Sequence, residues 1–442
     1  MRALHLGTRF AGTDGVSLEA EKVAWALGTL GLEPFFCAGE VSKERTAAAN
    51  TFCLPAMHFE DPAAAALGAR MFGGGEDEGL RRDLRAAAVA LADDLMEVVT
   101  TVRPDLLVIQ NAWAIPMQLP LAEALALVAT RTGLPCLSHE HDYFWERERF
   151  AAYADPAFLD TFFPFHAPNV RHLCINTPAR RALHERRGLE ARVLPNVMDF
   201  AHPAPGVDAY NADFREAIGL SEAHTLFLQP TRVVPRKGIE LAIDLLAELA
   251  DPAHVLVVTH RAGDEGLAYL RHLEAYAAVK RVELRYVAER VDESRRVEGD
   301  TKIYALSDIY PHADFVTYPS LYEGFGNALL ETVYFRKPAF VNRYRVFETD
   351  IAPKGFRFVE ISGAVTPEAV RAVAQLLEDP EAHREMVEHN YALALEHFSY
   401  DALKDVLAAE VAALGLSPVL GDPFGPPIPT AQGVHPHFRK RV

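Results

Sequence analysis

The chain has 442 residues, 50% of them hydrophobic and 24% charged, which is the balance of a soluble globular protein with room for two domains. It contains 44 Lys and Arg residues and 61 Asp and Glu residues, so the formal net charge is −17. Such an acidic chain repels nucleic-acid backbones and anionic lipid, so nucleic acid is not an expected partner and any bound phosphate needs a local basic cluster.

The first half of the chain alternates short apolar runs with helical segments. We expect strands at residues 3–6, 35–37, 106–109, 136–138 and 172–175, and helices at 16–30, 63–101 with a bend at 73–75, 120–130 and 178–187. Strands that alternate with helices indicate an α/β fold with a doubly wound parallel sheet. Ligands of such a sheet bind beyond the carboxyl ends of its strands.

Two strand ends in this half carry candidate ligand-binding residues. Gly12 and Gly15 follow the first strand and would let the backbone approach a phosphate or sugar, although a structural turn is the commoner reason for a lone glycine loop. The segment 138–150 holds two histidines, an aspartate, three glutamates and four aromatic residues. Its His139 and His141 could form half of a metal site, but no companion cluster has ligand spacing, so we expect no metal there.

The second half repeats the alternation of strands and helices. We expect strands at 225–228, 255–258, 282–287, 315–318 and 338–341, and helices at 239–249, 303–310, 327–334, 366–377 and 402–414. The charged segment 288–304 is interpreted as a surface loop, and the Pro- and Gly-bearing residues 416–442 as an extended tail. These patterns predict an N-terminal domain at 1–203 and a C-terminal domain at 204–398, with a last helix within 399–415.

A basic pair precedes the helix expected at 239–249. Arg232 and Lys237 would surround its start, where their charges, the helix dipole and free N–H groups act on one anion such as a diphosphate. Basic residues before a helix are commonly solvated, so this pair needs support from elsewhere in the chain.

The stretch Tyr318-Pro-Ser-Leu-Tyr-Glu-Gly-Phe-Gly-Asn-Ala-Leu-Leu-Glu331 joins a strand, a glycine turn and a helix start, which together make an anion site. A carboxylate beside a phosphate is repelled by about 1 kcal/mol in water and roughly 4 kcal/mol at an intermediate dielectric. Glu323 and Glu331 therefore suit neutral hydroxyls better. Glu331 lies about 6 Å along the helix from Asn327, which suits a ribose and leaves Glu323 for a sugar. The pattern indicates a sugar nucleotide, although a solvated Glu331 on an amphipathic helix is the alternative.

This motif, with Glu323 and Glu331, resembles the hallmark of retaining glycosyltransferases of family 4. The segment with Arg232 and Lys237 is similar to the diphosphate clamp of that family, and the likeness extends over most of the chain. The resemblance implies a GT-B architecture, in which two Rossmann-like domains with parallel sheets face each other across a cleft. It also implies that the helix within 399–415 crosses back to the first domain.

The resemblance assigns roles to particular residues. In its catalytic set, His141 faces the donor sugar and is oriented by Asp142, while Glu323 holds the sugar and Arg232 and Lys237 stabilise the departing diphosphate. The donor-binding residues that it implies are Gly15, Arg232, Lys237, Glu323, Gly324, Phe325, Gly326, Asn327, Ala328, Leu329 and Glu331. For the acceptor, we expect stacking on Tyr143 and Trp145 and an ionic contact from Arg147.

The activity so implied is retaining transfer of a hexose from a nucleotide diphosphate sugar, GDP-mannose or UDP-glucose, to a hydroxyl of a small soluble acceptor. Residues 110–120 and 141–150 look like a subgroup that includes mannosylglucosylglycerate synthases, which favours a sugar acid such as glucosylglycerate. A GT-B-like epimerase or phosphorylase and a non-catalytic sugar-nucleotide sensor are the alternatives. No tightly bound cofactor is expected, and the lack of an Asp-x-Asp motif argues against an essential divalent metal.

The sequence also predicts a compartment. The start Met-Arg-Ala-Leu-His-Leu-Gly lacks the form of a signal peptide, and no run reaches the roughly 18 apolar residues of a membrane span. The scattered Cys37, Cys53, Cys136 and Cys174 indicate buried free thiols in a reducing environment. We expect a cytoplasmic protein without stable membrane insertion, and the sequence leaves open whether it is a homo-oligomer.

Overall fold

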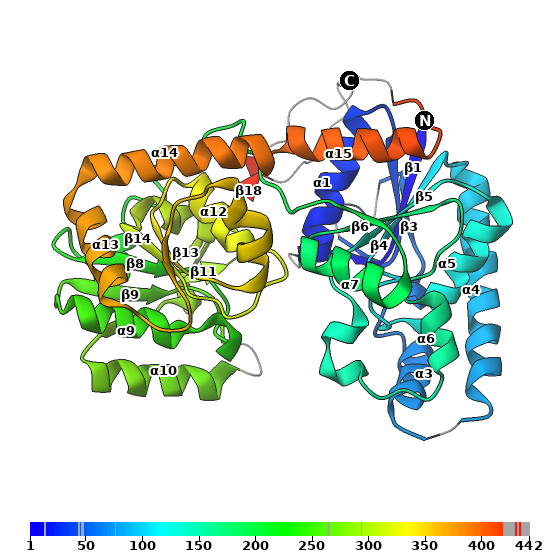
Figure 1. Ribbon diagram of the computed structural model, residues 1–442, viewed down its shortest axis with the longest axis horizontal. Helices are drawn as coiled ribbons and strands as arrows, with labels where there is room; N and C mark the ends of the chain where they lie inside the picture. Colours follow the sequence, from blue (N-terminus) through cyan, green and yellow to red (C-terminus); the bar gives the residue numbers. More distant parts are fainter. Residues whose placement is uncertain are drawn as a thin grey trace. The chain divides into compact units, whose positions relative to one another are not determined.

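The computed structural model describes residues 1–12, 15–42, 45, 48–75, 77–262, 266–292, 294–418, 429–430 and 433–434. The chain forms two compact units (Figure 1). Met1–Pro195 and Asp401–Pro427 make up most of the first, and Asn196–Tyr400 makes up most of the second. Residues 196–203, expected in the N-terminal domain, belong to the second unit. Met198 N–H donates to the Phe398 carbonyl at 2.9 Å, and the Tyr391 hydroxyl donates to the Phe200 carbonyl at 2.7 Å.

A seven-stranded sheet forms the centre of the first unit, and all its neighbouring pairs are parallel. The strand order is β3-β2-β1-β4-β5-β6-β7. The strands are β1 (Arg2–Phe10), β2 (Glu33–Val41), β3 (Thr51–Cys53), β4 (Leu106–Gln110), β5 (Cys136–Glu140), β6 (Val170–Cys174) and β7 (Ala191–Val193). All of β4 is buried, which explains why it appears in the sequence as a continuous apolar run.

Helices flank this sheet, and their ends carry the expected local signals. They are α1 (Gly15–Thr29), α3 (Pro62–Phe72), α4 (Leu80–Val102), α5 (Leu119–Thr132), α6 (Pro156–Phe162) and α7 (Thr177–Arg187). The Asp61 carboxylate caps α3 by accepting the Ala64 N–H at 2.9 Å. Gly188 ends α7 with a φ of 66°, and Gly74 and Gly75 make the bend between α3 and α4 with φ values of 81° and 99°.

One further helix of the first unit comes from the far end of the chain. Helix α15 (Tyr400–Ala413) lies beside α1 (Figure 1), where the Lys404 ammonium is 5.6 Å from the Trp25 ring centroid. Glu410 accepts a hydrogen bond of 2.5 Å from Arg171 of β6, and Leu407 is fully buried. The first unit is therefore built from two separated chain segments.

The second unit contains a six-stranded sheet of order β10-β9-β8-β14-β15-β16, again parallel throughout. Its strands are β8 (Thr225–Gln229), β9 (His254–Val258), β10 (Glu283–Tyr286), β14 (Phe315–Tyr318), β15 (Ala339–Asn342) and β16 (Val359–Ile361). Its helices include α8 (Phe214–Ala217), α9 (Ile239–Leu249), α10 (Gly266–Lys280), α12 (Asn327–Tyr334), α13 (Pro367–Glu378) and α14 (Pro380–His397). Leu246 of α9, Leu273 of α10 and Val373 of α13 share one buried core with Phe227 of β8.

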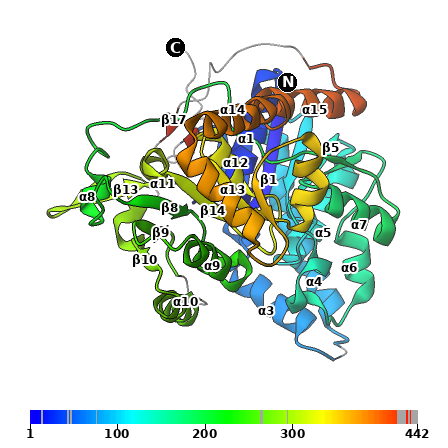
Figure 2. The ribbon, with the colours of Figure 1, turned by 60° about the vertical axis from the view of Figure 1, so that its left-hand side comes forward.

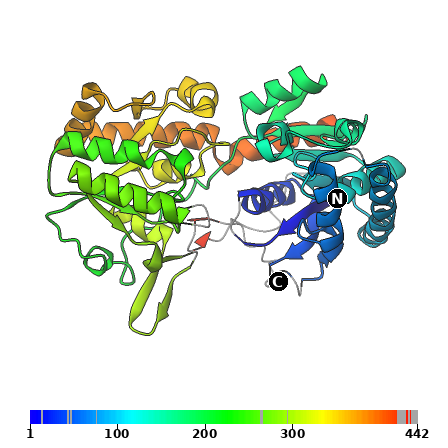
Figure 3. The same ribbon diagram turned by 90° about the horizontal axis from the view of Figure 1, so that it is seen from below.

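The charged segment at 288–304 forms strands, so its interpretation as a loop is wrong. β11 (Val291–Asp292) and β12 (Arg296–Glu298) pair with opposite edges of β13 (Thr301–Ala305). Figure 2 shows β13 beside α8, and Figure 3 shows the yellow-green hairpin of β12 and β13 extending from the rest of the second unit. The helix expected at 303–310 is also wrong, because β13 leads into the short α11 (Leu306–Ile309).

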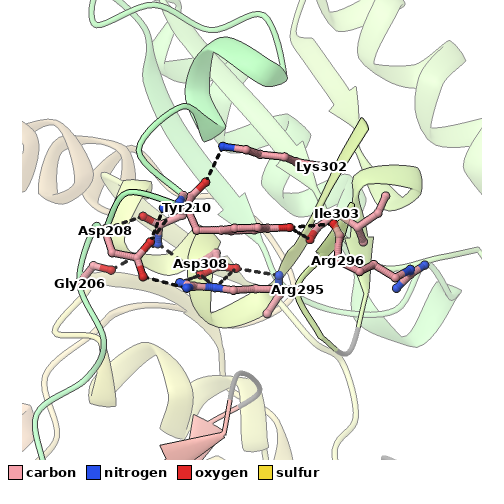
Figure 4. Close-up of polar contacts among 10 residues, drawn as sticks. Gly206, Asp208, Tyr210, Arg295, Arg296, Lys302, Ile303 and Asp308 are labelled. Atoms are coloured by element: carbon pink, nitrogen blue, oxygen red, sulfur yellow. Dashed lines mark hydrogen bonds and ion pairs between the residues drawn. The ribbon is translucent and has the colours of Figure 1, made fainter. Parts of the chain in front are cut away.

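Side-chain hydrogen bonds fasten this small sheet to the chain before α8 (Figure 4). The Tyr210 hydroxyl donates to the carbonyls of Arg296 at 2.7 Å and Ile303 at 2.8 Å. The Arg295 guanidinium binds the carboxylate of Asp308, of which 1% is exposed, with one contact of 2.9 Å. These contacts join residues that are distant in sequence, and local pattern could not predict them.

Replacing Arg295 with alanine is expected to destabilise the second unit by roughly 2–3 kcal/mol, because it leaves the buried Asp308 carboxylate without its cation. The neighbouring Arg296 pairs with Asp292 and Glu298 at a more exposed position, so Arg296→Ala is a matched control with little expected effect. Thermal or urea unfolding of both variants tests this. Equal stability of the two variants would contradict the anchoring role of Arg295.

Two smaller expectations concern the tail and the cysteines. Most of the tail expected at 416–442 lies outside the described residues, within which β17 (Pro429–Thr430) and β18 (Gly433–Val434) pair antiparallel. Cys37, Cys136 and Cys174 are buried free thiols as expected, whereas the free thiol of Cys53 is exposed.

Candidate active site

Each sheet reverses its strand order at one point, between β1 and β4 in the first unit and between β8 and β14 in the second. Ligands of open α/β sheets bind at this point, outside the carboxyl ends of the strands. Lys237 follows β8 and Glu323 follows β14. The second sheet therefore brings two predicted site residues to its own reversal point.

Lys237 and Glu323 form a buried ion pair there. The Lys237 ammonium donates to the Glu323 carboxylate, and the exposed fractions of the two side chains are 9% and 8%. Arg236 donates to the other carboxylate oxygen at 3.1 Å and to the Tyr322 carbonyl at 3.0 Å. The ammonium has three donors, so it can hold Glu323 and still offer an N–H to a phosphate oxygen.

Burial and the opposite charge act against each other on both groups of this pair. Burial acts to raise the pKa of Glu323, but the charge and hydrogen bond of Lys237, together with Ser320 and Arg236, lower it overall. Burial lowers the pKa of Lys237, opposed by the Glu323 carboxylate. A cation held in a dry position beside an acceptor for neutral hydroxyls is suited to bind both parts of a sugar diphosphate.

Gly238 lets the two loops that carry this pair approach each other. Its φ is 59°, and a Cβ there would lie 2.5 Å from the Pro319 carbonyl oxygen. Nearby, Leu321 N–H donates to the Arg236 carbonyl at 2.8 Å. The glycine after Lys237 is therefore required by the fold of the site.

The glycine turn and helix predicted at 324–331 are present, with α12 beginning at Asn327. Gly326 has a φ of 126°, and the Tyr344 hydroxyl donates to the Phe325 carbonyl at 2.9 Å. The first N–H groups of the helix, including those of Asn327 and Ala328, have no acceptor within the helix and could serve a phosphate. Leu329 does not suit a donor contact, since its N–H donates to the Gly326 carbonyl at 3.0 Å.

Side chains of this motif divide between core and surface. Phe325 packs against Phe398 with ring centroids 5.5 Å apart, so any donor contact there comes from its backbone, as it must from the partly buried Gly324. Glu331 is partly exposed on α12 and accepts a hydrogen bond of 3.1 Å from the buried Tyr310 hydroxyl. That contact orients the carboxylate, and its binding to a ribose stays a prediction.

Arg232 lies in the loop after β8 with an exposed side chain. Within the described part of the chain, its guanidinium has no hydrogen bond or ion pair, unlike that of Arg236. It is nevertheless close enough to Lys237 to help lower the pKa of that ammonium. Arg232 thus remains available to a diphosphate oxygen, as predicted for the clamp.

His141 belongs to the first unit, directly after β5, and its side chain is buried. Its backbone N–H donates to the Asn111 side-chain oxygen at 3.0 Å, and Asn111 holds a left-handed φ of 56° after β4. The ring of His141 lies 4.5 Å from that of His139, which is near the Gln110 amide oxygen at 3.1 Å. The end of β4 therefore positions His141.

One oxygen of the Asp142 carboxylate accepts a hydrogen bond of 2.7 Å from Arg147, and the orientation of His141 by Asp142 stays a prediction. Burial raises the pKa of Asp142, and the Arg147 guanidinium opposes that rise. Because Arg147 is already paired, it would have to share its charge in order to bind an acceptor anion. The sequence predicted that both residues belong to the site, but it did not predict that they pair with each other.

Tyr143 cannot stack on a sugar, because it is fully buried and its ring lies 4.5 Å from that of Trp145 with an interplanar angle of 16°. Arg186 and Arg187 of α7 contact the Trp145 ring at centroid distances of 5.4 Å and 5.7 Å. The two aromatic residues thus stabilise the loop after β5, and the predicted acceptor contact through Tyr143 is wrong.

Comparison with known proteins identifies the family of this chain. Residues 211–392 match the profile of the family described as glycosyl transferases group 1. A mannosylglucosylglycerate synthase from Thermotoga maritima is 32% identical over 433 residues, which cover 90% of this chain and 96% of that protein. The chain belongs to the group 1 glycosyltransferases. A mannosylglucosylglycerate synthase from Petrotoga mobilis is 30% identical over 380 residues, covering 80% of this chain and 85% of that protein.

The fold of this glycosyltransferase is also similar to solved structures. A glycosyltransferase from Rickettsia africae aligns with a TM-score of 0.64 at 13% identity, covering 93% of this chain and 98% of that one. The predicted resemblance to family 4, the GT-B fold and the glycosyltransferase activity are confirmed.

Three residues near the sites of this glycosyltransferase were not among the predicted ones. They are Asn111, Arg236 and His260. His260 had a usable signal, since it lies two residues beyond the strand expected at 255–258. Asn111 and Arg236 had none, because the direction of a side chain in a loop depends on the chain around it.

Gly15 begins α1 and is exposed, and a Cβ there would meet no atom of the described chain within 4 Å. Gly15→Ala is therefore expected to leave the melting temperature unchanged while lowering kcat/KM by about tenfold or more, through loss of close backbone approach to the donor. Gly68→Ala in α3, where the added methyl also meets nothing, is the matched control. Equal activity of both variants would remove Gly15 from the donor site.

Among the described residues, no group of three or more His, Cys, Asp or Glu side chains is arranged to hold a metal ion. In the same part of the chain, no helix is long and apolar enough to cross a bilayer. Metal independence and a cytoplasmic location of this glycosyltransferase stay predictions.

Proposed function

We propose that this glycosyltransferase moves a hexose from a nucleotide diphosphate sugar to a hydroxyl of a soluble sugar acid, with retention at the anomeric carbon. GDP-mannose is the first candidate donor and glucosylglycerate the first candidate acceptor, with UDP-glucose as the second donor. The observation that carries the proposal is the 32% identity to a mannosylglucosylglycerate synthase over 96% of that protein.

The geometry of the second unit supports a sugar nucleotide as donor. Lys237 and Arg232 supply cations beyond β8, and α12 starts beside them after β14. The barrier of the reaction is cleavage of an anomeric C–O bond while negative charge builds on the departing diphosphate. Fixed cations and helix N–H groups lower that barrier because they are already oriented when the charge forms.

The other classes have less support. Both curated relatives that span most of the chain are named synthases, which does not favour an epimerase, a phosphorylase or a non-catalytic sensor. Incubation with the donor alone separates these classes. Isomerised nucleotide sugar formed without an acceptor would favour the epimerase.

The proposal is tested by thermal shift with GDP-mannose and UDP-glucose, followed by transfer assays with sugar acids. A donor at about a hundred times its dissociation constant should add about 2.7 kcal/mol of stability. Transfer to glucosylglycerate and not to neutral glucosylglycerol is expected if the acceptor carboxylate is recognised. Binding of neither donor would overturn the proposed donor class, and transfer only to neutral sugars would overturn the acceptor class.

A further inference from the structure

His260 lies at the edge of the second sheet where the donor is proposed to bind. Strand β9 ends at Val258, which pairs in register with Gln229 at the end of β8. His260 therefore leaves β9 beside the point where the loop with Arg232 leaves β8. Its side chain is partly exposed, so a ligand can reach it.

Two basic side chains of the proposed clamp act on His260. Burial and the nearby positive charges of Lys237 and Arg232 lower the pKa of His260 to about 4, so its imidazole is neutral at pH 7 in the free protein. One ring nitrogen, Nδ1, lies 3.0 Å from the Thr259 hydroxyl. With the hydroxyl donating to Nδ1, the proton of the neutral ring would sit on Nε2.

The groups packed around this loop do not supply a carboxylate to His260. The next residue, Arg261, approaches Asp292 of β11 at 4.0 Å, and Ala262 N–H donates to the Tyr286 hydroxyl at 2.7 Å. Glu323 is occupied by Lys237 and Arg236. Among the described residues, the charges that act on His260 are therefore the cations of the proposed clamp.

We propose that His260 is a further donor-binding residue, whose imidazole contacts the diphosphate of the nucleotide sugar and takes up a proton as that diphosphate binds. This inference rests on the proposed function. A diphosphate brings negative charge to the cations that disfavour a charged imidazole, so the free energy of protonation becomes favourable. The site then holds a third positive charge only when the donor is present.

The proposal has a definite dependence on pH. The pKa of His260 is low in the free protein and higher in the complex, so donor binding takes up a proton between the two values. Donor affinity consequently rises as the pH falls through the bound value, by at most about tenfold per pH unit for one proton, and levels off near pH 4. A histidine with a purely structural role would give no such linkage.

The experiment is calorimetric titration of the protein with intact GDP-mannose and UDP-glucose at pH 6, in two buffers of different ionisation heat. The diphosphate of an intact sugar nucleotide is doubly esterified and does not titrate near neutral pH, so proton uptake reports on the protein. The wild type is expected to take up about half a proton or more per donor bound. His260→Gln is expected to take up no proton from this group, and its affinity should fall further below that of the wild type at pH 6 than at pH 8.

His272→Gln is the matched control, because His272 is an exposed histidine on α10 of the same unit. It should keep the proton uptake of the wild type. Equal uptake by His260→Gln and the wild type would overturn the inference while leaving the proposed function intact. If the variant does not fold, wild-type affinity that is unchanged from pH 8 to pH 6 would overturn it as well. Failure of both donors to bind would overturn the proposed function and this inference together.

Discussion

Replacing Lys237 with alanine is expected to lower the turnover of hexose transfer by roughly a hundredfold or more, which corresponds to the loss of one preorganised charge contact in the transition state. The Lys237 ammonium is fixed by Glu323 at the reversal point of the second sheet, so it needs no reorganisation as charge develops on the diphosphate. Steady-state rates at saturating donor test this. Near-normal turnover would refute the clamp.

The same change affects stability, because among the described residues it leaves Arg236 as the remaining cation paired with the buried Glu323 carboxylate. The expected cost is about 2–3 kcal/mol. The double variant Lys237→Ala/Glu323→Gln should recover much of that stability but none of the turnover. Recovery of both together would mean that Lys237 acts only through folding.

Arg232→Ala separates catalysis from stability in another way. Its side chain is exposed and makes no ion pair with a described residue, so its removal should leave the melting temperature unchanged. We expect a loss of turnover of roughly a hundredfold for this variant too.

Replacing Gly238 with alanine is expected to destabilise the second unit by about 3 kcal/mol and to lower its unfolding midpoint by roughly 6–12 °C. Two costs add at this position. The φ of 59° disfavours any residue with a Cβ, and the new Cβ would lie 2.5 Å from the Pro319 carbonyl oxygen, which is backbone and cannot rotate away. Thermal unfolding with and without GDP-mannose measures both the stability and the donor site.

Gly299→Ala isolates the first of these costs. Gly299 turns the hairpin between β12 and β13 with a φ of 60°, and a Cβ there meets no described atom within 4 Å. Its expected cost is about 1 kcal/mol. If the two variants were equally stable, close approach of the loops after β8 and β14 would not be what requires glycine at 238.

The fold was predictable where local pattern and burial agree. Helix α9 runs over Ile239–Leu249 as expected, since its apolar residues recur on one face, and α12 begins directly after the predicted glycine turn. The hairpin at β12 and β13 was not predictable, because its charged residues are typical of a solvated loop. Its strands depend on Tyr210, more than eighty residues away, whose hydroxyl bonds to both of them.

The sequence predicted which strand ends carry the site residues, but it did not predict how those residues contact one another. Lys237 and Glu323 were placed at the ends of β8 and β14, but their ion pair depends on how two loops approach in space. Likewise, Asp142 and Arg147 were both expected at the site, and only the turn after β5 makes them partners. Tyr143 was misassigned because an aromatic residue in a polar segment can pack in the core instead of binding a ligand.

The two-part origin of the first unit bears on how the protein is made. Helix α15, with Leu403, Leu407 and Val411 buried, leaves the ribosome only after residues 196–399, most of the second unit, have been synthesised. A nascent chain that ends at Pro195 thus exposes the apolar surface that α15 later covers. The main part of the second unit is continuous in sequence from Asn196 to Tyr400. Its core can therefore form before the last helix of the first unit has been synthesised.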